Sequence, residues 1–148
     1  MRWFLTPLVI LVIGIVVLAA CQSKSNVFSH KAGDCYNGPS FSVEKHTDVT
    51  NVELVNCDEP HISEVYAIFE LPESSWKGDD YVAEQASIGC KARFEAFVGI
   101  EWELTTLATN YIYPVEESWK ELDDRLVQCS VTEYPPKKVS GSLKGSRR

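Results

Sequence analysis

The sequence predicts an α+β domain: a small antiparallel sheet of about five strands with one main helix packed on a face, stapled by two disulfides. Three observations lead to this prediction. Segments rich in β-branched and aromatic residues flank a single long segment with helical spacing. Four cysteines are spread over these segments, and 148 residues suit one domain. The expected order is three strands, a helix, a strand, a short helix and a last strand.

The N-terminus has the form of an export signal. Residues 1–20 read MRWFLTPLVILVIGIVVLAA, a nearly continuous apolar run that ends in small residues before Cys21. The ending resembles a bacterial lipobox. We therefore expect residues 1–20 to be a lipoprotein signal peptide, and Cys21 to carry diacylglycerol with palmitate-type acyl chains. The alternative is an uncleaved membrane span over 3–20. Both place residues 22–148 on the extracytoplasmic face of the cell membrane.

Composition divides the remainder of the chain. Residues 21–31 are polar and predict a flexible tether, residues 32–134 form the domain, and residues 135–148 predict a basic flexible tail. The formal net charge is −7, and all 21 acidic residues precede Tyr134. This acidic balance argues against nucleic acid as a partner. The five cations of the tail are either simply solvated or contact anionic lipid headgroups or wall polymers.

Three strands are expected before the main helix. A short strand carries Cys35, a second covers 51–57, and a third covers 61–71. Alternation in the third strand predicts a core face made of Val65, Ala67, Phe69 and Leu71.

The main helix is predicted over 80–98. Its apolar stripe follows spacings of three and four and consists of Ala83, Ala86, Cys90, Phe94 and Phe97. Asp79 or Asp80 is expected to cap its start, and Gly99 stands where a helix C-terminal glycine belongs. Beyond it we expect a strand over 105–113, a short helix from Pro114 and a last strand over 125–133.

The number of cysteines agrees with an exported protein. Of the five cysteines, Cys21 is assigned to the lipid, which leaves Cys35, Cys57, Cys90 and Cys129 for two disulfides. Three pairings are possible, and the sequence does not choose among them. We favour Cys35–Cys57, between two early strands, and Cys90–Cys129, between the helix and the last strand.

Catalytic motifs are absent from the sequence. It has no GxSxG, P-loop, HExxH or SxxK motif, and no CxxC or His-x-His spacing, so we expect no cofactor, no metal and no enzyme activity. Glu64 and Glu70 on one strand are a weak candidate for paired acids. The candidate binding residues are Glu59, His61, Trp76 and Trp119. Their competing interpretation is structural: His61 bonded to a loop carbonyl, Asp58 or Glu59, and the tryptophans covering the rim of the core.

Several of these residues also match the pattern of a known family. Four elements stand in a fixed order along the chain: Gly33-Asp34-Cys35, Cys57 to Val65 with Pro60-His61 and Glu64, Cys90, and Trp119 followed by Asp124-Arg125 and Cys129. Together they resemble the septum formation family of actinobacterial exported proteins. This chain departs from the family pattern at Asp123, where a glycine is expected. The resemblance implies an envelope protein of cell division, includes all four domain cysteines, and supplies no catalytic residues.

The sequence thus favours a lipid-anchored binding or scaffold module for septum formation or envelope assembly. Its expected partners are the membrane, through Cys21, and division or cell-wall proteins or wall polymers. Two alternatives stay open: a small-ligand-binding or stress-sensing lipoprotein, and a wall-active enzyme using His61.

Overall fold

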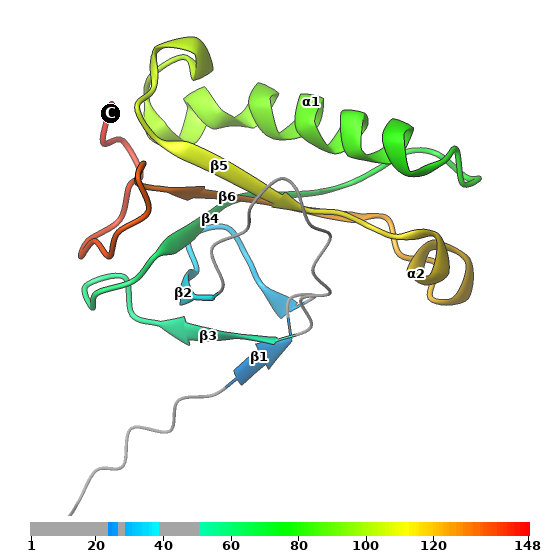
Figure 1. The fold of residues 1–148 in the computed structure, drawn as a ribbon, viewed down its shortest axis with the longest axis horizontal. Coiled ribbons are helices and arrows are strands. Elements are labelled where there is room, and N and C mark those ends of the chain that lie inside the picture. The colour runs from blue at the N-terminus through cyan, green and yellow to red at the C-terminus, as the bar shows by residue number, and fades with distance from the viewer. Residues whose placement is uncertain (1–23, 27–28, 39–50) are drawn as a thin grey trace, which may run out of the picture.

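The computed structural model describes residues 24–26, 29–38 and 51–148; the predicted signal peptide and Cys21 lie outside this part of the chain. Six antiparallel strands form one sheet in the order β1-β3-β2-β4-β6-β5. The elements are β1 (Lys24–Asn26), β2 (Cys35–Asn37), β3 (Asn51–Val55), β4 (Ser63–Glu70), α1 (Asp79–Val98), the 3-10 helix η2 (Trp102–Leu104), β5 (Ala108–Ile112), α2 (Glu116–Glu121) and β6 (Leu126–Thr132). Figure 1 shows α1 lying along the β4, β6 and β5 part of the sheet. The predicted fold class is confirmed.

The main core fills the space between α1 and the sheet. The helix buries Val82, Ala86, Cys90, Phe94 and Val98, a stripe close to the predicted one, against β4 and β6. At Gly89, an added Cβ would lie 2.2 Å from the end of the Phe69 ring, so the glycine lets the helix approach the sheet closely. Gly99 ends the helix in the left-handed conformation (φ 84°), as predicted. The start of the helix differs from the prediction. Gly78 is the N-cap and makes no side-chain capping hydrogen bond, and the two predicted caps, Asp79 and Asp80, lie inside the first turn.

Both favoured disulfides are confirmed. Cys35 is bonded to Cys57 and Cys90 to Cys129. The second bond ties the middle of α1 to the middle of β6 and lies within the core. Closing a loop of this length stabilises a fold by about 3–4 kcal/mol in the chain-entropy account.

A bulge in β4 corrects the predicted core face. Val65 pairs with Ser130 and Ala67 with Cys129, which leaves Tyr66 without a partner in β6. Because the extra residue reverses the alternation of faces, Tyr66 and Ala67 both join the main core. Val65 instead packs on the opposite face of the sheet with Tyr36 and Val52.

Both predicted flexible ends contain ordered structure. In the predicted tether, Lys24–Asn26 forms β1 and pairs with β3 at the edge of the sheet. Residues 139–148 of the predicted tail, here called the C-terminal strap, cross the end of the sheet that lies away from α2 (Figure 1). Leu143 is buried in the main core, which explains why so polar a segment packs in place.

Among the described residues, no helix is both long and apolar enough to cross a membrane.

Candidate functional site

The four candidate binding residues lie at two opposite ends of the sheet. Glu59 and His61 precede β4, at the end crossed by the C-terminal strap. Trp76 follows β4, and Trp119 lies in α2, at the other end. The structure therefore divides the predicted residues between two places, which we describe in turn.

His61 is held by backbone on both sides. Its ring is fully buried, and Nδ1 donates to the carbonyl oxygen of Glu59 at 2.8 Å, one of the structural partners predicted. Its backbone exchanges two hydrogen bonds with Val139 of the strap, at 2.9 and 2.8 Å. The other ring nitrogen, Nε2, is buried and has no hydrogen-bond partner among the residues that the structure describes. Glu59 itself is exposed.

Glu64 is the residue that holds the strap. Its side chain is 1% exposed, and its two oxygens accept hydrogen bonds of 2.6 Å from Ser142 Oγ and the backbone N–H of Leu143. Hydrogen bonds to a charged acceptor are about twice as strong as neutral ones. Glu64 and Glu70 are six residues apart along β4, about 20 Å, which is too far for the paired acids of a glycosidase. Sequence reasoning identified Glu64 as a motif residue but missed this role.

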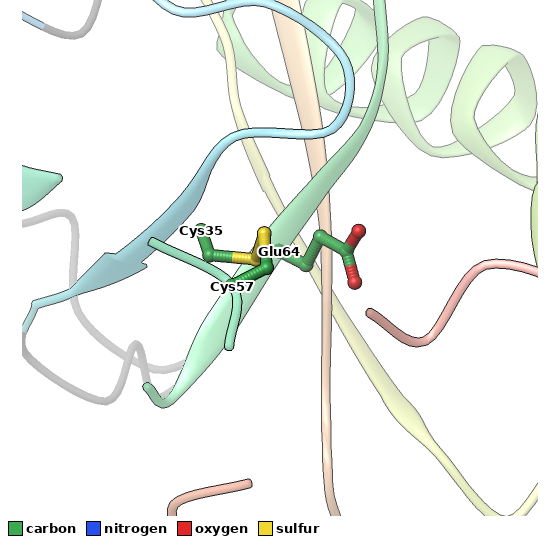
Figure 2. A group of neighbouring side chains, drawn as sticks. All are labelled: Cys35, Cys57 and Glu64. Atoms are coloured by element: carbon green, nitrogen blue, oxygen red, sulfur yellow. A yellow bond between two sulfur atoms is a disulfide. The ribbon is translucent and has the colours of Figure 1, made fainter. Parts of the chain in front are cut away.

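The Cys35–Cys57 disulfide lies against Glu64 (Figure 2). Both sulfurs and a carboxylate oxygen of Glu64 lie within 4.8 Å of one another. Cysteine binds metals as the thiolate, and the two sulfurs of a disulfide are not thiolates. In this oxidised form the three side chains are therefore a structural cluster. Gly141 N–H of the strap also donates to the carbonyl oxygen of Cys57 at 2.6 Å.

The strap also closes the end of the main helix. The N–H groups of Gly145 and Arg147 donate to the carbonyl oxygens of Phe97 and Val98, at 2.8 and 2.9 Å. These carbonyls belong to the last turn of α1, which leaves such groups unpaired. Leu143 enters the core between the Glu64 contact and the helix contacts. The C-terminal strap is thus bound to β4, to the Cys57 turn and to α1 together.

Trp119 and Arg125 organise the opposite end. Trp119 is 3% exposed and meets Trp76 edge to face at 5.5 Å between ring centroids. Arg125 stacks on Trp119 at 3.8 Å and donates to the carbonyl oxygens of Glu73, Trp119 and Asp124. Its guanidinium also pairs with Asp123 at 2.9 Å. Trp119 is part of the main core, with Trp76 partly buried against that core, and the Trp-Asp-Arg motif fixes α2 to the loop after β4.

The surface of this end is acidic and partly apolar. Leu122 is 71% exposed and Val115 38% exposed, on either side of α2. The surrounding exposed acids are Asp79, Asp80, Glu116, Glu117, Glu121 and Asp123. Burial, then the charges of neighbouring groups that include Asp79 and Asp80, raise the pKa of Tyr113, just before α2.

A buried polar row lies on the sheet face opposite α1. His30 Nδ1 and Gln128 Oε1 are 2.9 Å apart, and both residues are buried. Tyr36 lies beside His30, with 5.9 Å between ring centroids. Burial raises the pKa of Tyr36, while hydrogen bonds with Ser130 and Ser63 act in the opposite direction. The sequence analysis left His30 in the tether and missed this row.

The chain matches no curated protein and no solved structure. Residues 19–147 match the family model described as septum formation. This match covers both ends of the sheet and both disulfides, and it supports a role in septum formation or cell division. The chain therefore belongs to the septum formation family.

Proposed function

We propose that the protein is an extracytoplasmic lipoprotein, anchored through Cys21, that serves septum formation as a non-enzymatic binding or scaffold module. The observation that carries the proposal is the family match over residues 19–147. The Leu18–Cys21 ending of the apolar run supports the anchor. Two acyl chains would hold the protein stably at the membrane surface.

The positions of the motif residues favour binding over catalysis. His61 and Glu64 are buried beneath the strap, and each is bonded to backbone. Trp119 and Arg125 are bonded or stacked within the α2 end. A general acid or base must reach its substrate, whereas these side chains face other parts of the same chain. A scaffold uses such residues to hold a surface rigid.

The α2 end is the surface we assign to the partner. Leu122 and Val115 supply exposed apolar side chains on a helix that Arg125 and Trp119 hold in place. The ring of acids around them selects for positive charge. The partner is accordingly a protein segment that combines basic with apolar side chains.

Imaging tests the proposal in cells. The full-length tagged protein, expressed in its native host, should concentrate at midcell during division. Cys21→Ser should release it from the membrane and abolish that pattern. A uniform envelope signal through the division cycle would overturn the septal role.

Crosslinking in the same cells tests the surface. Leu122→Glu should lower partner capture at midcell several-fold, because it replaces the most exposed apolar side chain of the α2 end with a further acid. Leu104→Glu is the matched control, since Leu104 is 64% exposed on η2, beside the strap end. Equal losses from the two variants would refute the assignment of the α2 end. His61→Ala tests the enzymatic alternative: a division defect confined to this variant, with normal folding and capture, would favour catalysis.

A further inference from the structure

The two disulfides have different surroundings. Cys90 and Cys129 are 1% and 0% exposed, inside the main core. Cys35 is also buried, but its partner Cys57 is only half-buried and begins a turn in which Asp58 and Glu59 are exposed. A thiolate reaches a disulfide only where a sulfur is accessible. Cys57 is therefore the most exposed of the four domain cysteines, which makes Cys35–Cys57 the disulfide nearer to solvent.

The disulfide nearer to solvent is also the one that touches the strap attachment. Its sulfurs lie within 4.8 Å of a carboxylate oxygen of Glu64. Glu64 binds Ser142 and Leu143, and the Cys57 carbonyl binds Gly141. Figure 2 shows the Glu64 side chain between the disulfide and the strap. Three consecutive strap residues thus depend on groups that the disulfide positions.

We propose that Cys35–Cys57 is a thiol–disulfide exchange site for a dithiol reductant, and that its reduction releases the C-terminal strap from Glu64. The proposal does not depend on the partner surface at α2. It assigns a modification site, its co-substrate by chemical class, and the segment that responds.

The exchange proceeds in two balanced steps. One thiolate of the reductant attacks Cys57 Sγ, the S–S bond breaks, and Cys35 Sγ leaves with the electron pair as a mixed disulfide forms. The second thiolate of the reductant then attacks the reductant sulfur of that mixed disulfide and expels Cys57 Sγ. The two cysteine sulfurs take up the two protons that the reductant's thiols lose. Two electrons pass to the protein, and the reductant ends as a disulfide.

Reduction would act on the strap through Glu64 and through the Cys57 turn. Once reduced, the two sulfurs are no longer bonded and must move apart, beside the buried carboxylate of Glu64. Each new S–H is a donor beside the carboxylate and competes with the Ser142 and Leu143 donors. The turn also loses the link that closed its loop, so the Cys57 carbonyl is no longer fixed beneath Gly141. All three strap contacts weaken together.

The test is a dithiothreitol titration of the full-length protein in detergent micelles. Alkylation and mass spectrometry report which cysteines are reduced, while hydrogen exchange reports the amides of Gly141 and Leu143. Cys35 and Cys57 should be reduced at a dithiothreitol concentration that leaves Cys90–Cys129 intact. At that concentration the Leu143 amide should exchange about tenfold faster or more, the loss expected for a hydrogen bond to a charged acceptor, and the Gly141 amide, which donates to a neutral carbonyl, about threefold faster or more. Amides in the middle of α1, around Cys90, should be unchanged.

Variants separate this coupling from general loosening. Cys35→Ser with Cys57→Ser should give fast strap exchange without reductant, and Cys90→Ser with Cys129→Ser should leave the strap response to reductant in place. Glu64→Gln should loosen the strap in both redox states, with Glu70→Gln, exposed on the same strand, as its control. If a cysteine variant fails to fold, the titration of the native chain still decides the matter. Unchanged strap exchange after reduction of Cys35–Cys57, or reduction of Cys90–Cys129 at the same concentration, would overturn the proposal.

Discussion

Each end of the sheet is closed by one charged side chain that hydrogen-bonds an irregular segment, and the two charges are opposite. At the strap end the anion Glu64 accepts hydrogen bonds from the strap. At the α2 end the cation Arg125 donates to the carbonyl oxygens of Glu73, Trp119 and Asp124. The two arrangements solve the same problem, the attachment of an irregular segment to the end of a sheet.

The two ends differ in burial and in how far along the chain their partners lie. Glu64 is 1% exposed, and both of its strap partners are almost 80 residues away, whereas the Arg125 side chain is 16% exposed and has Asp123 as an exposed counter-ion. Two of the three Arg125 carbonyls lie within six residues of it. The α2 end therefore assembles mostly from local contacts, while the strap end requires most of the domain to be folded first. This difference predicts that the α2 end rarely opens, whereas the strap can detach while the rest of the domain stays folded.

Trp119→Ala should have the largest effect, because it empties the centre of the α2 end. The ring is 3% exposed and contacts Trp76 and Arg125. Loss of a buried tryptophan costs about 3–5 kcal/mol in the free energy of unfolding, which urea unfolding followed by circular dichroism would measure. Trp119→Phe is the control: it keeps an aromatic face for Arg125 and removes an indole N–H that has no partner within the described part of the chain. If the two variants lose the same stability, the stacking is not what holds this end.

Leu143→Ala is the equivalent test at the strap end. Leu143 is 3% exposed in the main core, and leucine-to-alanine changes there cost about 2–5 kcal/mol. We expect about 2–3 kcal/mol, below the Trp119→Ala loss, because a terminal segment can shift to fill part of the space. Strap amides should lose more hydrogen-exchange protection than α1 amides do. Leu104→Ala, at an exposed leucine, should change neither quantity. A uniform loss of protection would show that the strap does not open separately from the rest of the domain.

Arg125→Lys should cost less, about 1–2 kcal/mol, since it retains the charge but loses the planar stacking group and its fork of donors. The partly buried carbonyl oxygens of Trp119 and Glu73 would lose the Arg125 donors they now have. Thermal unfolding would report the loss, and Lys77→Ala, an exposed cation in the loop after β4, supplies the control. A neutral Arg125→Lys result would mean that charge alone organises the α2 end.

Local patterns in the sequence were enough for most of the fold. The three- and four-residue spacing predicted the main helix to within one residue of Asp79–Val98, and Gly99 marked its end. Strand-like segments predicted β2 to β6, and the cysteine positions favoured the observed pairing. These features are local or link neighbouring elements, so sequence periodicity carries them.

Sequence reasoning failed where a contact joins distant segments. The bulge at Tyr66 is defined by its register with β6, and nothing in the alternation of residues 61–71 announces it. The strap holds one large apolar residue, Leu143, whose burial requires Glu64 and the end of α1 to be in place. Sequence reasoning interpreted His61 and Trp119 either as binding residues or as structural ones, and the structure places both in buried positions.

Asp123→Gly should have the smallest effect and the opposite sign. Asp123 adopts the left-handed conformation (φ 54°), which glycine accepts without strain and other residues adopt at a cost of about 1 kcal/mol. The substitution also removes the ion pair with Arg125, but the Asp123 side chain is 92% exposed, and such pairs contribute about 0.5 kcal/mol or less. The net expectation is a gain of roughly 0.5 kcal/mol in the free energy of unfolding. Asp123→Asn separates the two contributions, since asparagine tolerates the left-handed region and lacks the charge. A loss of stability in both variants would mean that the ion pair, and not the backbone, decides the turn; a gain in Asp123→Gly alone would explain why the family resemblance expects glycine at this position.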